Sequence, residues 1–350
     1  MFIIRQMPDP ARLRPLPANE PYRRAFYGRF LRESCIVFAK CRRVDMPPFT
    51  QRLSIKAARG GRETYFIDHR SVSVDDDNFL ILNDGRKYGS AVDSKRDVES
   101  YSIFFRKGLP EEVLGALVAP GDRILDRSDW QASQTVEFVE SLQPHDRLVT
   151  PVLGYIRHHL AHGLEEEGWY DEQLHFLLER MLMHHRHVIR AVRSTAALKS
   201  STRAEIYRRI CLATDYIHTH YDEQLDLDVL ASAACLSKFH FLRLFTDIHG
   251  LTPHAYLQRK RVAVAARLFA STRMSTEEVA AEVGYAARSS LFRQMRRWHG
   301  VNPRALRQRS KRGSHENPDL RLRGAVFLHE PHQHGRPDTH AERPAQAAGL

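Results

Sequence analysis

The chain has 350 residues, a length that favours two domains, and its 42% hydrophobic residues argue against wholesale disorder. Lys and Arg total 53 against 42 Asp and Glu, a net charge of +11. The surplus is uneven, because residues 203–312 hold 19 basic and 10 acidic side chains and so carry +9 of it. A basic domain joined to a near-neutral one suggests an anionic partner, although a solvated basic surface would give the same count.

Cysteine spacing and hydropathy indicate the cellular compartment in which the protein is expected. The four cysteines form no Cys-x-x-Cys pair and no zinc-finger spacing, as expected of reduced thiols. The N-terminus has too short an apolar run for a signal peptide, and no stretch approaches the roughly 20 apolar residues that cross a bilayer. We therefore expect a soluble cytoplasmic protein without a membrane partner.

The first half of the chain changes character near residue 49. Residues 1–48 contain several prolines and no long periodic element, which predicts an irregular N-terminal arm. Short apolar runs then alternate with turn signals such as Asp75-Asp76-Asp77 and Asn83-Asp84-Gly85. This pattern predicts about six strands in a small antiparallel sandwich or barrel. We expect strands that include residues 53–57, 64–67, 71–74, 79–82 and 98–105.

Helical periodicity follows the strands. Apolar residues recur every four positions over 148–160, and a second stripe covers 174–188. These helices complete a predicted domain over 49–193, where they either cover the sheet or pair with another subunit. The Ser-, Thr- and Ala-containing segment 194–201 is the predicted linker. The His-, Pro- and Gly-rich tail, residues 313–350, is predicted to be disordered.

Two similar helical patterns occupy residues 202–312. In the first, helices are predicted near 226–234 and 238–248, with Cys235-Leu236 as a short turn, Ser237 as N-cap and Gly250 as the stop. A linking helix over 253–269 follows. The pattern then repeats, with Ser275 and Glu278 as a capping box and a further helix over 288–299. Helix, short turn, helix is the helix-turn-helix arrangement.

These residues resemble the DNA-binding domain of the AraC/XylS family of regulators. The match is carried by segments 225–231 and 236–245, the Gly-Leu-Thr-Pro at 250–253, and segments 279–285, 290–293 and 300–303. Met295 and Leu306 stand where the family has aromatic residues; both are apolar, so we expect altered packing and an intact fold. The resemblance implies an α+β protein: an N-terminal cupin-like β-sandwich or barrel with appended helices, then an all-α domain with two helix-turn-helix units.

The resemblance also implies which side chains face DNA. Arg pairs bidentately with guanine, so Arg243 and Arg293 are predicted to contact bases, with a phosphate contact or plain surface charge as the alternative. Phe239 and Leu242 contact thymine methyl groups or are ordinary apolar surface. The full predicted set is Lys238, Phe239, Leu242 and Arg243 on the first recognition helix and Arg288, Ser289, Ser290 and Arg293 on the second, with Arg296 and Arg297 on phosphates.

The strand-rich block resembles, more weakly, the cupin-like sensor domain of this family, through its strand spacing and Phe79–Gly85. That implies effector sensing, dimerisation or both. Cupin enzymes bind metal through several histidines, whereas residues 51–106 contain only His69. His158 and His162 share a helix face without an identified third ligand. We therefore expect no catalytic residues, no metal and no cofactor, while a small-molecule effector in the barrel stays open.

The sequence thus favours a sequence-specific transcription regulator that binds double-stranded DNA. Recruitment of RNA polymerase as an activator is what the resemblance implies, and a homodimer is compatible with it. Two alternatives were weighed. One is a cupin-type enzyme fused to a DNA-binding module, and the other is a non-specific architectural DNA-binding protein, which reads mainly shape and backbone.

Overall fold

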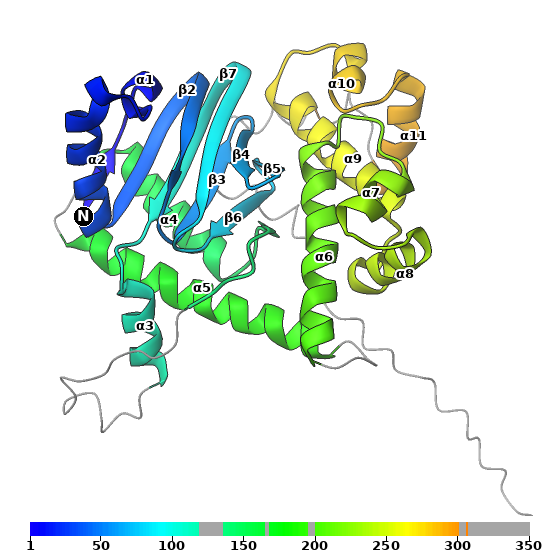
Figure 1. Cartoon of the computed structure of the whole chain (residues 1–350). Coiled ribbons are helices and arrows are strands. Elements are labelled where there is room, and N and C mark those ends of the chain that lie inside the picture. The colour runs from blue at the N-terminus through cyan, green and yellow to red at the C-terminus, as the bar shows by residue number, and fades with distance from the viewer. Residues whose placement is uncertain (119–135, 165–167, 195–199, 301–305, 307–350) are drawn as a thin grey trace, which may run out of the picture.

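The structure is a computed structural model that describes residues 1–118, 136–164, 168–194, 200–300 and 306. Its first half is a sheet with helices packed on it, and its second half is entirely helical. Figure 1 shows helix α6 (Ser200–Thr219) standing between the sheet and the remaining C-terminal helices. The predicted α+β class, with strands first and helices last, is confirmed.

In the described part of the chain the sheet has eight strands, in the order β1-β2-β7-β3-β6-β8, with β4 paired to β5 and β7. All pairs are antiparallel except β1 with β2. The long strand β7 connects two parts of the sheet, because it pairs with β4 through Tyr88–Ala91 and with β3 through Glu99–Phe104. The strands are β1 (Phe2–Ile4), β2 (Cys35–Thr50), β3 (Ser54–Arg59), β4 (Glu63–Ile67), β5 (Arg70–Val74), β6 (Asn78–Leu82), β7 (Lys87–Phe104) and β8 (Leu142–Pro144).

Residues 1–48 are not an irregular arm, so that prediction was wrong. They form α1 (Pro10–Leu13), a 3-10 turn at Pro17–Asn19, α2 (Glu20–Arg32) and most of β2. The prolines are compatible with these elements. Pro10 and Pro21 occupy first-turn helical positions, which need no N–H donor, and Pro47-Pro48 coincides with a register shift between Met46 and Phe49.

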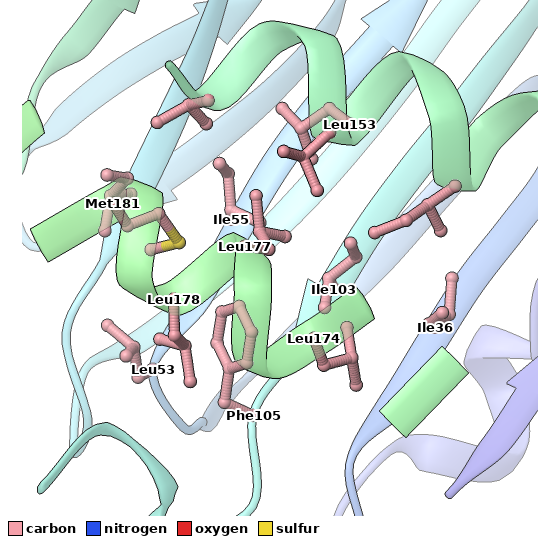
Figure 2. Close-up of a cluster of buried hydrophobic side chains, with 14 of the residues drawn as sticks. Ile36, Leu53, Ile55, Ile103, Phe105, Leu153, Leu174, Leu177, Leu178 and Met181 are labelled. Carbon is pink, nitrogen blue, oxygen red and sulfur yellow. The ribbon is translucent and has the colours of Figure 1, made fainter. Parts of the chain in front are cut away.

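Two of the helices cover one face of the sheet. These are α4 (Val149–Ala161) and α5 (Trp169–Ser194), which match the two predicted apolar stripes; α3 (Leu109–Val118) was not predicted. Figure 2 shows Leu153, Leu177 and Met181 facing Ile55 and Ile103 of the strands. Each such side chain contributes roughly 1.5–3 kcal/mol when fully buried. Of the two roles left open, α4 and α5 therefore cover the sheet of their own chain.

The C-terminal helices begin and end close to the predicted caps and stops. They are α7 (Leu227–Ala233), α8 (Lys238–His249), α9 (Pro253–Ser271), α10 (Thr276–Glu282) and α11 (Arg288–His299). Gly250 and Gly300 end α8 and α11 in the left-handed conformation, with φ of 66° and 64°. The predicted tail, 313–350, lies outside the described residues, as does the greater part of the predicted linker, 194–201.

Within the described ranges, no single helix combines the length and apolar composition of a membrane span; the bent pair α7 and α8 meets those two criteria together. The same ranges contain no group of three or more His, Cys, Asp or Glu side chains placed to hold a metal ion.

Candidate nucleic-acid interface

The first helix-turn-helix unit is held rigid by a small core and a tight turn. Asp226 caps α7 by accepting a hydrogen bond from the Val229 amide at 2.8 Å. Cys235 then turns the chain with φ of 51°, a conformation that non-glycine residues seldom adopt. This turn lets Phe241 and Phe245 of α8 bury completely in the C-terminal core, where Leu230 of α7 also lies. The opposite face of α8 is therefore presented outward.

The second unit repeats this construction. The capping box of Ser275 and Glu278 starts α10, as predicted. Gly284 has φ of +79°, and a Cβ there would lie 2.4 Å from the carbonyl oxygen of Asp222, so only glycine fits. Leu291 and Met295 of α11 are fully buried. Met295, where the family has an aromatic residue, thus takes its place in the core.

The two units share an ion pair between the recognition helix and the helix that precedes it. The first residue of each recognition helix forms an ion pair with an acidic residue in the first turn of the preceding helix. Lys238 Nζ lies 2.5 Å from Asp228 of α7, and Arg288 Nη1 lies 2.8 Å from Glu277 of α10. All four side chains are more than half exposed, so each pair contributes about 0–1 kcal/mol. These pairs orient the first basic side chain of each helix toward its neighbouring helix.

The predicted side chains of α8 are all exposed. Phe239 is 76% exposed, the largest value among the exposed large hydrophobic residues that the structure describes, and Leu242 is 37% exposed. Arg243 is 67% exposed, with its Nε 4.0 Å from the carboxylate of Asp247. An apolar ring, an aliphatic side chain and a guanidinium therefore lie on the outer part of one helix.

The predicted side chains of α11 are also at the surface. Ser290 is half-buried, and the others are exposed. Within the described ranges, Arg293, Arg296 and Arg297 have no carboxylate within 4.0 Å. Together with Ser289 and Phe292 they line an open surface hollow of about 510 Å³. Figure 1 shows α8 and α11 on the side of the C-terminal domain away from the sheet.

Not every basic residue of the domain belongs to this surface. Arg261 of α9 donates from Nε to the Tyr221 carbonyl and from Nη2 to the Glu223 carbonyl, both at 2.6 Å. Lys260 and Arg267 of α9 point into the boundary with the sheet. The charge surplus of residues 203–312 therefore overstates the number of cations available to an anionic partner.

The boundary with the sheet is an ionic cluster that the sequence did not predict. Lys260 Nζ lies 2.6 Å from Asp75 and 2.9 Å from Asp77, and Arg267 also pairs with Asp77. Burial alone would raise the pKa of Asp77, but Lys260 and Arg267 lower it below its usual value. The acidic run in the β5–β6 turn was the visible signal; its partners lie more than 180 residues away.

Helix α6 provides a second set of contacts to the sheet. Arg70 Nη1 donates to Asp215 Oδ2 at 2.9 Å, and Asp215 Oδ1 accepts from the Leu142 amide at 2.9 Å. Just after the end of α6, Asp222 accepts a hydrogen bond from Arg62 Nη2 at 2.8 Å. These contacts and the α9 cluster join the two halves of the chain on the side opposite α8 and α11.

Comparisons with known proteins found a matching family and several relatives. A family described as "Helix-turn-helix domain" matches residues 230–309. The probable transcriptional regulator LumQ of Photobacterium leiognathi is 34% identical over 92 residues, 26% of this chain and 37% of LumQ. The RCS-specific HTH-type transcriptional activator RclR of Escherichia coli K12 is 36% identical over 83 residues, 24% of this chain and 29% of RclR. The chain thus spans about a third of the length of these curated relatives.

Among solved structures, the DNA-binding domain of AdpA in complex with a target DNA is similar to this chain at 28% identity. That similarity covers 31% of this chain and 98% of the AdpA chain, with a TM-score of 0.30. The family match and the two regulators agree with the paired helix-turn-helix units described above. Residues 230–309 thus match a helix-turn-helix domain, and the two curated relatives are named as a transcriptional regulator and a transcriptional activator.

Proposed function

We propose that the chain is a sequence-specific transcription regulator that inserts α8 and α11 into successive major grooves of one DNA duplex. The observation that carries this proposal is that each recognition helix presents an exposed arginine, Arg243 or Arg293, on the side of the domain away from the sheet. Successive major grooves on one face of B-DNA are about 34 Å apart. The rigid core of the C-terminal domain would fix both helices relative to that spacing.

The residue roles follow from exposure and pairing. Arg243 and Arg293 are proposed to bind guanine bidentately, and Phe239 and Leu242 to contact thymine methyl groups. Because Lys238 and Arg288 are turned toward Asp228 and Glu277, we assign them to phosphates or to the edge of the groove. In this proposal Ser289 and Ser290 contact the nucleic acid near the start of α11, and Arg296 and Arg297 contact phosphates.

The N-terminal half is proposed to be a cupin-like sensor and dimerisation domain in a cytoplasmic protein. The mostly antiparallel sheet, in which β7 pairs with β2, β3 and β4, supports this assignment. Ion pairs on α6 and α9 join this sensor to the DNA-binding domain. An effector bound to the sensor would therefore change the position or mobility of the DNA-binding domain. In an activator, that change would control contact with RNA polymerase.

Both alternatives are less well supported. The two recognition helices carry different side chains, with Phe239 and Leu242 on α8 and Ser289 and Ser290 on α11. Such differences suit two different half-sites better than architectural binding. The relatives LumQ and RclR are named as regulators, which favours regulation over a cupin enzyme fused to a DNA-binding module.

Selection of binding sites from random duplexes with the full chain tests the proposal. We expect two base clusters whose centres lie about 10 base pairs apart, one for each recognition helix. A single cluster, or retention of duplexes without any enriched sequence, would contradict it.

A further inference from the structure

A cavity lies inside the N-terminal half, on the side of the sheet that α2 covers. Its volume is about 60 Å³. Since one water needs only about 10–15 Å³ of such space, the cavity has room for about four to six non-hydrogen atoms, the size of glycine or alanine. Part of its wall is apolar and comes from α2, β2 and β7: Phe26, Phe30, Met46, Phe49 and Phe104.

Three polar side chains that line this cavity are almost fully buried. Lys56 is 1% exposed, Glu63 is 2% exposed and Gln51 is 6% exposed. Burial lowers the pKa of Lys56 well below its usual value, and Glu63 acts in the opposite direction. A buried charge is costly unless it is paired and hydrogen-bonded, so such groups call for an explanation.

Lys56 has ring contacts but no hydrogen-bond or ion-pair partner among the described residues. Its Nζ lies 3.4 Å from the ring centre of Phe104 and 5.2 Å from that of Tyr88. Among the described residues no carboxylate lies within 4.0 Å of it, although Glu63 lines the same cavity. The Oε1 atom of Gln51 is likewise buried without a hydrogen-bond partner in the described part of the chain. The cavity wall therefore offers an amine, which an anionic ligand would hold protonated, and a neutral acceptor, both without hydrogen-bond partners in the described part of the chain.

Glu63 supplies the opposite charge at a separate position. Its Oε2 accepts a hydrogen bond from Ser100 Oγ at 2.6 Å, which leaves further acceptor capacity on the carboxylate. A ligand with only an anionic group would satisfy Lys56 but would meet the carboxylate of Glu63. A ligand with only an ammonium group would satisfy Glu63 and Gln51 and leave Lys56 unpaired. An occupant with both groups matches all three.

We propose that this cavity binds a small zwitterionic amino acid with an apolar side chain. Lys56 receives its carboxylate, Glu63 and the Gln51 carbonyl receive its ammonium group, and the phenylalanine-lined wall receives its side chain. This site is separate from the DNA-binding surface. The two proposals can therefore fail independently, because ligand binding is measured without DNA and DNA binding without ligand.

Calorimetric titration of the full chain tests the assignment. The probes are glycine and L-alanine, together with propionate and ethylamine, which each keep one of the two charged groups of alanine. At least one amino acid should bind, and at least about tenfold more tightly than either single-charge analogue, since hydrogen bonds to charged groups are worth about 1.5–3 kcal/mol. Equal binding of propionate, or no binding of either amino acid, overturns the proposal.

Variants connect the binding to the named residues. Lys56→Met keeps the packing volume and removes the buried amine, and Glu63→Gln keeps the hydrogen bond from Ser100. Each should weaken binding of the amino acid at least about tenfold. Lys87→Met, at an exposed position of β7, is the matched control and should bind as the unmodified chain does. A melting temperature for Lys56→Met no lower than that of the unmodified chain establishes that it folds. Unchanged affinity in both cavity variants overturns the proposal.

Discussion

Lys260 of α9 lies 2.9 Å from Asp77 in the turn between β5 and β6, 183 residues away in the chain, and both side chains are at most 2% exposed. This buried pair joins the linking helix of the DNA-binding domain to the sheet. Asp75 and Arg267 complete the cluster, so that two carboxylates face two cations. A balanced cluster of this kind is costly to disturb from one side only.

Lys260→Met tests this cluster. Removing the ammonium leaves Asp75 and Asp77 buried with Arg267 as their remaining cation in the cluster, and we expect the free energy of unfolding to fall by about 3–5 kcal/mol. Denaturant unfolding measures the change. Lys87→Met, an exposed lysine, should stay within about 0.5 kcal/mol of the unmodified chain. Equal stability of the two variants would show that the pair does not form.

His218 of α6 predicts a pH dependence. Burial and the nearby Lys260 lower its pKa to about 3, against an ordinary value of 6.5. The unfolded chain therefore takes up a proton at a pH where the folded chain does not. The contribution of His218 to the free energy of unfolding is fully present above about pH 6.5. It is lost as the pH drops toward 3, and about 2 kcal/mol is already lost at about pH 5.

The variant His218→Gln should remove this contribution. Glutamine keeps a polar partner for the Tyr256 hydroxyl, which lies 3.0 Å from His218 Nε2. Unfolding curves at about pH 7 and pH 5 should then differ by about 2 kcal/mol less in the variant than in the unmodified chain. If the free energy of unfolding depended on pH equally in both proteins, His218 would be in contact with solvent in the folded chain.

Gly284→Ala should damage the second helix-turn-helix unit. The left-handed backbone costs about 1–2 kcal/mol with alanine, and the clash with the Asp222 carbonyl adds to that cost. Gly250→Ala is the matched control, because Gly250 has a similar φ of +66° but open space where the Cβ would lie. Thermal unfolding should show a larger loss for Gly284→Ala. Equal losses would mean that the close approach to Asp222 is relieved without cost.

The helix-turn-helix units could be predicted because their signals are local. Caps such as Ser275, stops such as Gly250 and apolar spacing within each helix depend on residues fewer than ten positions apart. The exposed positions of α8 and α11 follow from the same spacing. That each predicted DNA-facing residue is exposed or half-buried is compatible with the proposed roles, which stay a prediction until DNA binding is measured.

Long-range features could not be predicted in this way. Strand β2 does not alternate strictly between apolar and polar residues, because Cys35 and Ile36 are both buried, on different faces of the sheet. Its prolines suggested irregular structure, whereas its pairing with β7 determines its conformation. The partners of Asp77 likewise depend on how two domains dock, which no periodicity encodes.

The most direct test of the DNA-binding account is a competition measurement on a selected operator and a scrambled duplex of equal length. The unmodified chain should prefer the operator, and Arg243→Ala and Arg293→Ala should each lose about 1–3 kcal/mol on the operator while losing much less on the scrambled duplex. Each variant should also relax the base preference in only one of the two half-sites. An equal loss on both duplexes would contradict base recognition and reduce both arginines to phosphate contacts.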